Sequence, residues 1–171
     1  MIKHLKYGLT ALALTVLPVL ANAPASHATT ASSGSSAARA AAPAAVTTFR
    51  VVSRFSNRCL TANGDNVEVA ECSARPVAGQ DWYWEGTKLV NYAEAKCLDV
   101  RNGELDAPAQ LVGDCHGQAN QRWQWNGEQL RTDVNYQCLS IQNRGDWSPH
   151  AGINLRNCED TATWQRWYTR S

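Results

Sequence analysis

The sequence of 171 residues has little charge imbalance and lacks an apolar run long enough to cross a bilayer. Lys and Arg number 16 and Asp and Glu 15, and the balance stays near neutral when Lys3 and Lys6 are left out. Such a chain presents no electrostatic footprint for nucleic acid or an anionic membrane. The longest uncharged apolar stretch, Gly8–Leu20, is shorter than the roughly 20 residues that a membrane-spanning helix needs. Partners of both kinds are therefore not expected.

Residue types that enzymes use for nucleophilic chemistry are also scarce. Beyond the N-terminal region the only histidines are His116 and His150, and neither lies in a nucleophile motif. The sequence has no glycine-rich phosphate-binding loop, and its cysteines suit disulfides better than zinc. Asp99 and Asp114 could form a glycosidase pair, but so short a folded part offers no deep cleft for one. The sequence therefore predicts a protein that is not an enzyme and needs no cofactor or metal.

The N-terminus has the layout of a secretory signal peptide, assigned to residues 1–28. Basic Lys3 and Lys6 precede the apolar run, and small residues follow it up to Ala28. The alternative for the apolar run is a buried core helix. Residues 29–48 are rich in Ala, Ser and Thr, with one charge and no aromatic residue, which predicts a flexible tether. We therefore expect a secreted protein, bacterial by its alanine-rich composition, whose folded part is 49–171.

The folded part contains three copies of one unit of about 40 residues. The copies cover about 49–86, 87–127 and 128–171, and each has a Cys-Leu pair, a second cysteine and a closing Gln-x-Trp triplet. The Cys-Leu pairs begin at Cys59, Cys97 and Cys138, and the triplets are Gln80-Asp81-Trp82, Gln121-Arg122-Trp123 and Gln165-Arg166-Trp167. Three features that recur in phase establish an internal repeat.

All six cysteines lie in the repeats, and an even count in an exported chain predicts three disulfides. Six cysteines allow 15 connectivities. Because each unit holds two, pairing within the unit is the most economical arrangement. The expected disulfides are Cys59–Cys72, Cys97–Cys115 and Cys138–Cys158.

Local patterns in the units indicate short strands and tight turns. Asn66–Val69 and Ile153–Arg156 alternate between polar and apolar residues, as half-buried strands do. Aromatic stretches run into Glu85-Gly86 and Asn126-Gly127, which are hairpin signals. No sustained helical period occurs, so an all-β fold is expected. The closing tryptophans should share one core, with each preceding Gln bonded to backbone that the sheet leaves unpaired.

These residues resemble the ricin B-type lectin (β-trefoil) family, and in particular the carbohydrate-binding modules of secreted bacterial proteins. The resemblance rests on the threefold Cys-Leu, second Cys and Gln-x-Trp, and it covers all of 49–171. It implies a β-trefoil: a six-stranded barrel capped by three hairpins, with pseudo-threefold symmetry. It also implies up to three shallow sugar pockets, one in each unit.

The middle unit matches the family pocket best. In the family, an Asp accepts bonds from sugar hydroxyls, amides assist it, and an aromatic ring covers the apolar face of the sugar. Val112-Gly113 stands where the ring is expected, and the alternative role of the Asp is to hold a turn. The carbohydrate-binding residues that the resemblance implies are Asp99, Gln110, His116, Asn120 and Gln121.

The outer units depart further from this pattern. Thr61 and Ser140 replace the Asp of the first and third units, and Trp164 replaces the Asn of the third. We therefore interpret both as structural copies. The third unit also has a loop, 143–150, whose Trp147 could be a stacking platform, a protein-binding anchor or a cover for the barrel end.

The resulting hypothesis is weak, non-catalytic binding of a galactose-, N-acetylgalactosamine- or xylose-type glycan. The alternative is a protein-interaction module with decayed sugar sites, similar to the receptor-binding subunits of toxins or adhesins. A glycan or glycoconjugate is the expected partner in the first case, and a separate protein in the second.

Overall fold

A computed structural model describes residues 45–75 and 77–171 of the chain. The predicted signal peptide and most of the predicted tether lie outside the described residues. The described part contains these strands: β1 (Arg50–Ser53), β2 (Cys59–Asn63), β3 (Asn66–Ala70), β4 (Trp82–Glu85), β5 (Lys88–Asn91), β6 (Lys96–Val100), β7 (Ala109–Val112), β8 (Trp123–Asn126), β9 (Gln129–Thr132), β10 (Cys138–Ile141), β11 (Ala151–Arg156) and β12 (Trp167–Arg170).

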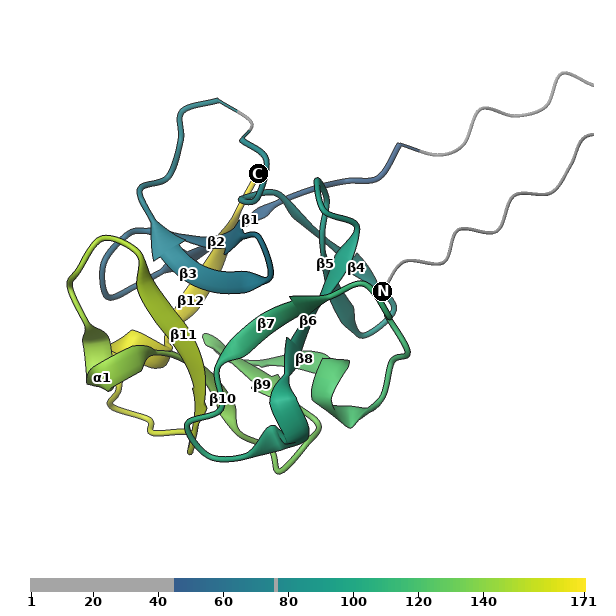
Figure 1. Ribbon diagram of the computed structural model, residues 1–171. Helices are drawn as coiled ribbons and strands as arrows, with labels where there is room; N and C mark the ends of the chain where they lie inside the picture. Colours follow the sequence, from purple (N-terminus) through teal and green to yellow (C-terminus); the bar gives the residue numbers. More distant parts are fainter. Residues whose placement is uncertain (1–44, 76) are drawn as a thin grey trace, which may run out of the picture. The chain divides into compact units, whose positions relative to one another are not determined.

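The strands form one curled sheet with antiparallel pairing throughout. β1 pairs with β12, so that the first and last strands join the two ends of the domain. The β2–β3, β6–β7 and β10–β11 hairpins, one from each repeat, meet around the middle of the fold (Figure 1), where β3 pairs with both β7 and β11. The predicted all-β trefoil is confirmed.

In the described part of the chain, helical structure is limited to single turns in the connections. Three are 3-10 turns, η1 (Arg101–Gly103), η2 (Ala119–Gln121) and η3 (Thr163–Gln165), and one is the short helix α1 (Gln142–Gly145). Within residues 45–75 and 77–171, no helix is long and apolar enough to cross a membrane.

The hairpin turns place glycine at the first position of a two-residue loop. Gly86 follows Glu85 in the β4–β5 turn, and Gly127 follows Asn126 in the β8–β9 turn. Both glycines have φ near +60°, which a side chain disfavours. Asn126 is the last residue of its strand and lies outside the loop. A turn of this kind needs positive φ only at its first position, and Gly127 supplies it.

The three closing tryptophans are buried in one core. Trp82, Trp123 and Trp167 are 0%, 2% and 1% exposed, and each indole N–H donates to the carbonyl of the leucine in its own Cys-Leu pair at 3.0 Å. The indole bond therefore ties the end of each repeat to its own second strand. The predicted shared core is confirmed.

Each repeat also contains one disulfide, as expected. Cys59–Cys72, Cys97–Cys115 and Cys138–Cys158 close segments of 13, 18 and 20 residues. In each repeat the bond joins the strand of the Cys-Leu pair to the loop before the closing triplet. This link fixes the loop on which most of the candidate site is built.

Candidate functional site

The glutamine of the closing triplet has the same structural role in each repeat. Its amide N–H donates to the carbonyl of the residue before the second cysteine, and its amide oxygen accepts a backbone N–H just after that cysteine. The expected bonding to unpaired backbone is confirmed. The glutamines are Gln80, Gln121 and Gln165.

The middle repeat adds a carboxylate to this arrangement. Asp99 lies in β6 opposite Gln110 of β7, and the Gln110 side chain donates to Oδ1 of Asp99 at 3.0 Å. Oδ2 accepts from Asn120 at 2.7 Å and from Gln121 at 3.1 Å, both in η2. Asp99 is 3% exposed, whereas Gln110 and Asn120 are only half-buried. Three side-chain amides thus hold one carboxylate in a fixed orientation.

The structure brings all five predicted residues together. Gln121 is fully buried, so it holds Asp99 from the protein side. His116 is exposed, and its Nε2 lies 3.1 Å from the Gln121 amide nitrogen. The backbone N–H of Gln118 donates to Nδ1 of His116 at 3.1 Å. His116 therefore stands at the outer edge of the set.

Two residues that brace the loop around His116 were missed from the sequence. Lys88 donates to the carbonyl of Cys115 at 3.3 Å, and Arg122 donates to that of Gly117 at 3.1 Å. Arg122 is the central residue of its triplet, and Arg166 of the third repeat likewise donates to a backbone carbonyl of its own loop. The recurring arginine was a signal that could have identified this support.

No aromatic ring completes the set at the family position. Val112 of β7 pairs with Cys97, and it is half-buried beside the exposed Gly113. The site can therefore accept and donate hydrogen bonds, but its β7 side offers a sugar only a small aliphatic contact.

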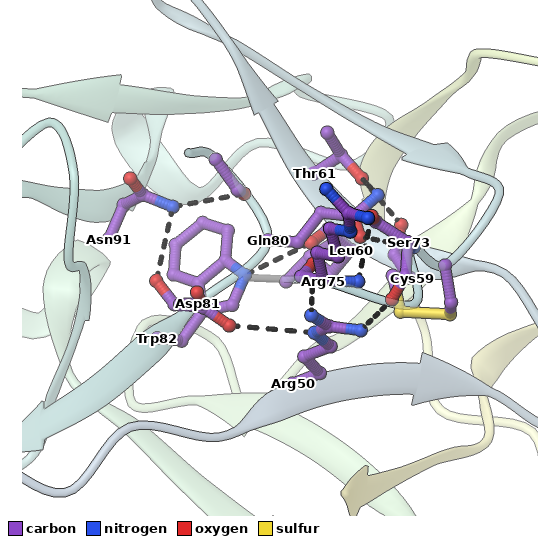
Figure 2. A network of polar contacts seen from close by, with 12 residues as sticks. Arg50, Cys59, Leu60, Thr61, Ser73, Arg75, Gln80, Asp81, Trp82 and Asn91 are labelled. Atoms are coloured by element: carbon purple, nitrogen blue, oxygen red, sulfur yellow. Dashed lines mark hydrogen bonds and ion pairs between the residues drawn. A yellow bond between two sulfur atoms is a disulfide. The ribbon is translucent and has the colours of Figure 1, made fainter. Parts of the chain in front are cut away.

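The first repeat lacks the carboxylate, and Figure 2 shows what replaces it. Gln80 donates to the Thr61 hydroxyl at 3.2 Å, at the position where Gln121 meets Asp99. Arg50 reaches the carbonyls of Ser73 and Arg75 in the neighbouring loop (Figure 2). These groups satisfy one another, and Thr61 supplies no carboxylate at this position.

The third repeat has Ser140 at the position of the carboxylate and Trp164 at the position of the Asn. Ser140 of β10 lies opposite Asn154, and its hydroxyl bonds to the Ile141 carbonyl. Trp164, in place of the Asn, lies edge-on to Phe55 of the first repeat, with 6.5 Å between ring centroids. The carboxylate position therefore holds a hydroxyl bonded to the neighbouring backbone, and the Asn position holds a packed aromatic ring.

A separate hollow of about 970 Å³ lies where the three hairpins meet. Equivalent residues of the repeats, Val67, Ala109 and Ile153, contribute to its lining. Several of its polar groups are paired with one another, as in the 2.6 Å contact between Nδ1 of His150 and Glu68. The residues that line it include no Trp, Tyr or Phe, so it lacks a stacking surface for a sugar.

The family model for the ricin-type beta-trefoil lectin domain matches residues 44–123 and 86–171. The chain belongs to this ricin-type lectin family. The match spans the described trefoil and agrees with the resemblance expected from the repeats.

Solved structures similar to this ricin-type domain share its fold. The lactose complex of the ricin B-like lectin from Macrolepiota procera is 15% identical, with a TM-score of 0.60 over 75% of this chain and 97% of that one. The C-half of the earthworm R-type lectin in complex with GalNAc is 13% identical, with a TM-score of 0.62 over 72% and 98%. ThreeFoil, a designed threefold-symmetric protein, is 20% identical, with a TM-score of 0.59 over 72% and 98%. No curated protein matches the sequence.

Proposed function

We propose that this ricin-type domain is a secreted, non-catalytic sugar-binding protein whose site lies in the middle repeat. The observation that carries the proposal is the Asp99 carboxylate, oriented by the amides of Gln110, Asn120 and Gln121. A carboxylate has about four acceptor positions, and these amides use three. Oδ1 accepts one of the three bonds, so it retains a position for a sugar hydroxyl.

Each residue of the site has a distinct role in this proposal. Asp99 accepts one hydroxyl, and the half-buried amides of Gln110 and Asn120 bond to neighbouring hydroxyls. Gln121 is a positioning residue because it is fully buried. His116 contacts the sugar from the rim through its ring face. Export rests on the proposed signal peptide in residues 1–28.

The proposed ligand is a galactose-, N-acetylgalactosamine- or xylose-type glycan. Vicinal hydroxyls match an acceptor flanked by amides, and the similar lectins named above were solved with lactose and GalNAc. A single shallow site without a ring corresponds to millimolar affinity, about −4 kcal/mol. Biologically useful binding then requires a multivalent glycan or a second site.

Replacement of Asp99 by Asn tests the site. We expect Asp99→Asn to abolish the saturable shifts that galactose, N-acetylgalactosamine and xylose cause in the Gln110 and Asn120 side-chain amide signals in NMR titrations, because one acceptor becomes a donor that faces other donors. The matched control is Asp114→Asn, which removes the same charge from an exposed side chain of the same repeat. Thermal unfolding of both variants verifies the fold. Equal binding by the two variants would refute the assignment of Asp99.

A second variant tests the missing ring. Val112→Trp puts an aromatic residue at the family position, and we expect it to tighten sugar binding several-fold through stacking on the apolar face of the ring. An affinity that does not change in a folded Val112→Trp protein would contradict the proposed orientation of the sugar on β7.

The protein-interaction alternative is favoured by one observation. Asp99 is only 3% exposed, so little of its carboxylate faces a ligand. It predicts capture of a protein partner from culture fluid that free galactose, N-acetylgalactosamine and xylose do not compete. Competition by any of these sugars instead supports the lectin function.

A further inference from the structure

Trp147 is an exposed aromatic residue that the middle-repeat site does not use. It lies between α1 and β11 in the third repeat and is 63% exposed. Tyr136 is as exposed, but the guanidinium of Arg131 lies 5.3 Å from the centre of its ring. Among the described residues, the one aromatic ring paired with Trp147 is that of Phe55, with 4.3 Å between the ring centroids.

The backbone that carries Trp147 is held firmly in place. Arg58 donates to the carbonyl of Trp147 at 2.7 Å and to that of Ser148 at 3.1 Å, and Glu71 holds Arg58 at 3.0 Å. The backbone N–H of Ser148 donates to Oδ1 of Asp146 at 2.7 Å. These bonds fix the backbone on both sides of the indole, and a fixed backbone lowers the entropy cost of binding a ligand there.

Phe55 supports the loop from below as well. Gly145 has φ +97°, and a Cβ there would lie 2.7 Å from the Phe55 ring. The β1–β2 turn of the first repeat therefore approaches the loop closely enough to require glycine. The indole therefore packs on Phe55 of the first repeat, which supports it from outside its own loop.

The size and surroundings of this patch favour a sugar over a protein. A stable protein interface buries about 800 Å² on each partner, far more than one indole and a half-buried Phe55 provide. The residues around it are polar, and Asp146 immediately precedes the indole in the chain. A pyranose needs one flat apolar surface with a hydroxyl acceptor nearby. Trp147 and Asp146 provide these two parts.

We propose that Trp147 and Asp146 form a second saccharide platform on the loop between α1 and β11. The pyranose stacks its C–H face on Trp147, and one hydroxyl donates to the carboxylate of Asp146. The platform shares the proposed ligand class of the middle repeat but none of its residues. It also differs in position from the family ring, since the residue equivalent to Val112 in this repeat is Arg156. One chain then offers two sugar contacts, which would raise its avidity for a multivalent glycan.

The test uses the full chain and the indole N–H signal of Trp147 in NMR spectra, assigned by its absence in Trp147→Ala. Galactose, N-acetylgalactosamine and xylose are added separately to about 50 mM, since millimolar affinity is expected. We expect at least one sugar to shift this signal, both in the unmodified protein and in Asp99→Asn. Asp146→Ala should weaken the response several-fold, and Tyr136→Ala, which removes another exposed ring, should leave it unchanged.

The outcomes separate this proposal from the proposed function. If Asp99→Asn abolishes sugar binding and the Trp147 signal never moves, the platform is wrong and the middle-repeat site stands. If the Trp147 signal moves and Asp99→Asn has no effect on binding, the platform stands alone. A third outcome is that no sugar moves the Trp147 signal and Trp147→Ala abolishes concentration-dependent association in sedimentation. The patch would then pair two copies of the chain, and the platform would be overturned.

Discussion

The buried amide of Gln121 makes the same two backbone bonds as Gln165, and it also donates to Oδ2 of Asp99, whereas Gln165 also accepts a bond from Gln129. We expect Gln121→Ala and Gln165→Ala each to lower the free energy of unfolding by about 1–3 kcal/mol, because buried backbone groups lose their partners. Only Gln121→Ala should also weaken sugar binding. Urea unfolding and NMR titration of both variants check this. Similar binding losses in the two variants would mean that Gln121 acts only through general stability.

Asp146 is one residue whose ionisation its own loop perturbs. The Ser148 hydroxyl and backbone N–H lower the pKa of Asp146 below its ordinary value. Since the folded pKa is below the unfolded one, this contribution to stability is present above about pH 4 and is lost as pH falls through the folded pKa. We expect Ser148→Ala to raise the pKa of Asp146, as measured by NMR titration of its carboxyl carbon. The stability difference between the two proteins should shrink below pH 4.

At the scale of elements, the Cys97–Cys115 disulfide joins the strand that carries Asp99 to the loop that carries His116. Replacement of this pair by serines should lower the free energy of unfolding by about 2–4 kcal/mol. The Cys138–Cys158 pair closes a segment of similar length, 20 against 18 residues, so its loss should cost about the same. Sugar binding at the middle-repeat site should weaken only in the first double variant. Calorimetric unfolding and titration at a temperature where both remain folded provide the comparison.

Strands, disulfides and the tryptophan core were predictable because each depends on a local pattern repeated three times. The Gln-x-Trp triplet indicated a buried tryptophan and a glutamine bonded to backbone, and both occur in every repeat. The hairpin signals were also right, although Asn126 ends a strand instead of entering the turn. That detail depends on φ at a single position, which the Asn-Gly pair alone leaves open.

The candidate site was less accessible to sequence reasoning, because its properties depend on distant residues. Spacing from the cysteine identified Asp99, but the degree to which three amides enclose it depends on how η2 packs on β6. Likewise, the sequence left three roles open for Trp147: a stacking platform, a protein-binding anchor or a cover for the barrel end. Its support comes from Phe55 and Arg58, which lie in another repeat.

At the scale of the whole molecule, the β6–β7 and β10–β11 connections are each braced by the following repeat. Gly103 of η1, just beyond Asp99, would place a Cβ 2.3 Å from Val134 of the third repeat. Gly145 of the third repeat would likewise place a Cβ 2.7 Å from Phe55 of the first. If this close packing matters, a methyl group at Gly103 should disturb more than its own turn.

Gly103→Ala and Gly127→Ala make a matched pair for this test. Both positions have positive φ, at +64° and +60°, but a Cβ at Gly127 would meet nothing within 4 Å. Gly127→Ala should therefore cost only the backbone term, about 1–2 kcal/mol. Gly103→Ala should cost about 1–3 kcal/mol more from overpacking against Val134, and it should weaken sugar binding as well. In urea unfolding, the double variant Gly103→Ala with Val134→Ala should lose less free energy of unfolding than the two single variants lose together. Additive losses would mean that the two repeats do not constrain each other at this contact.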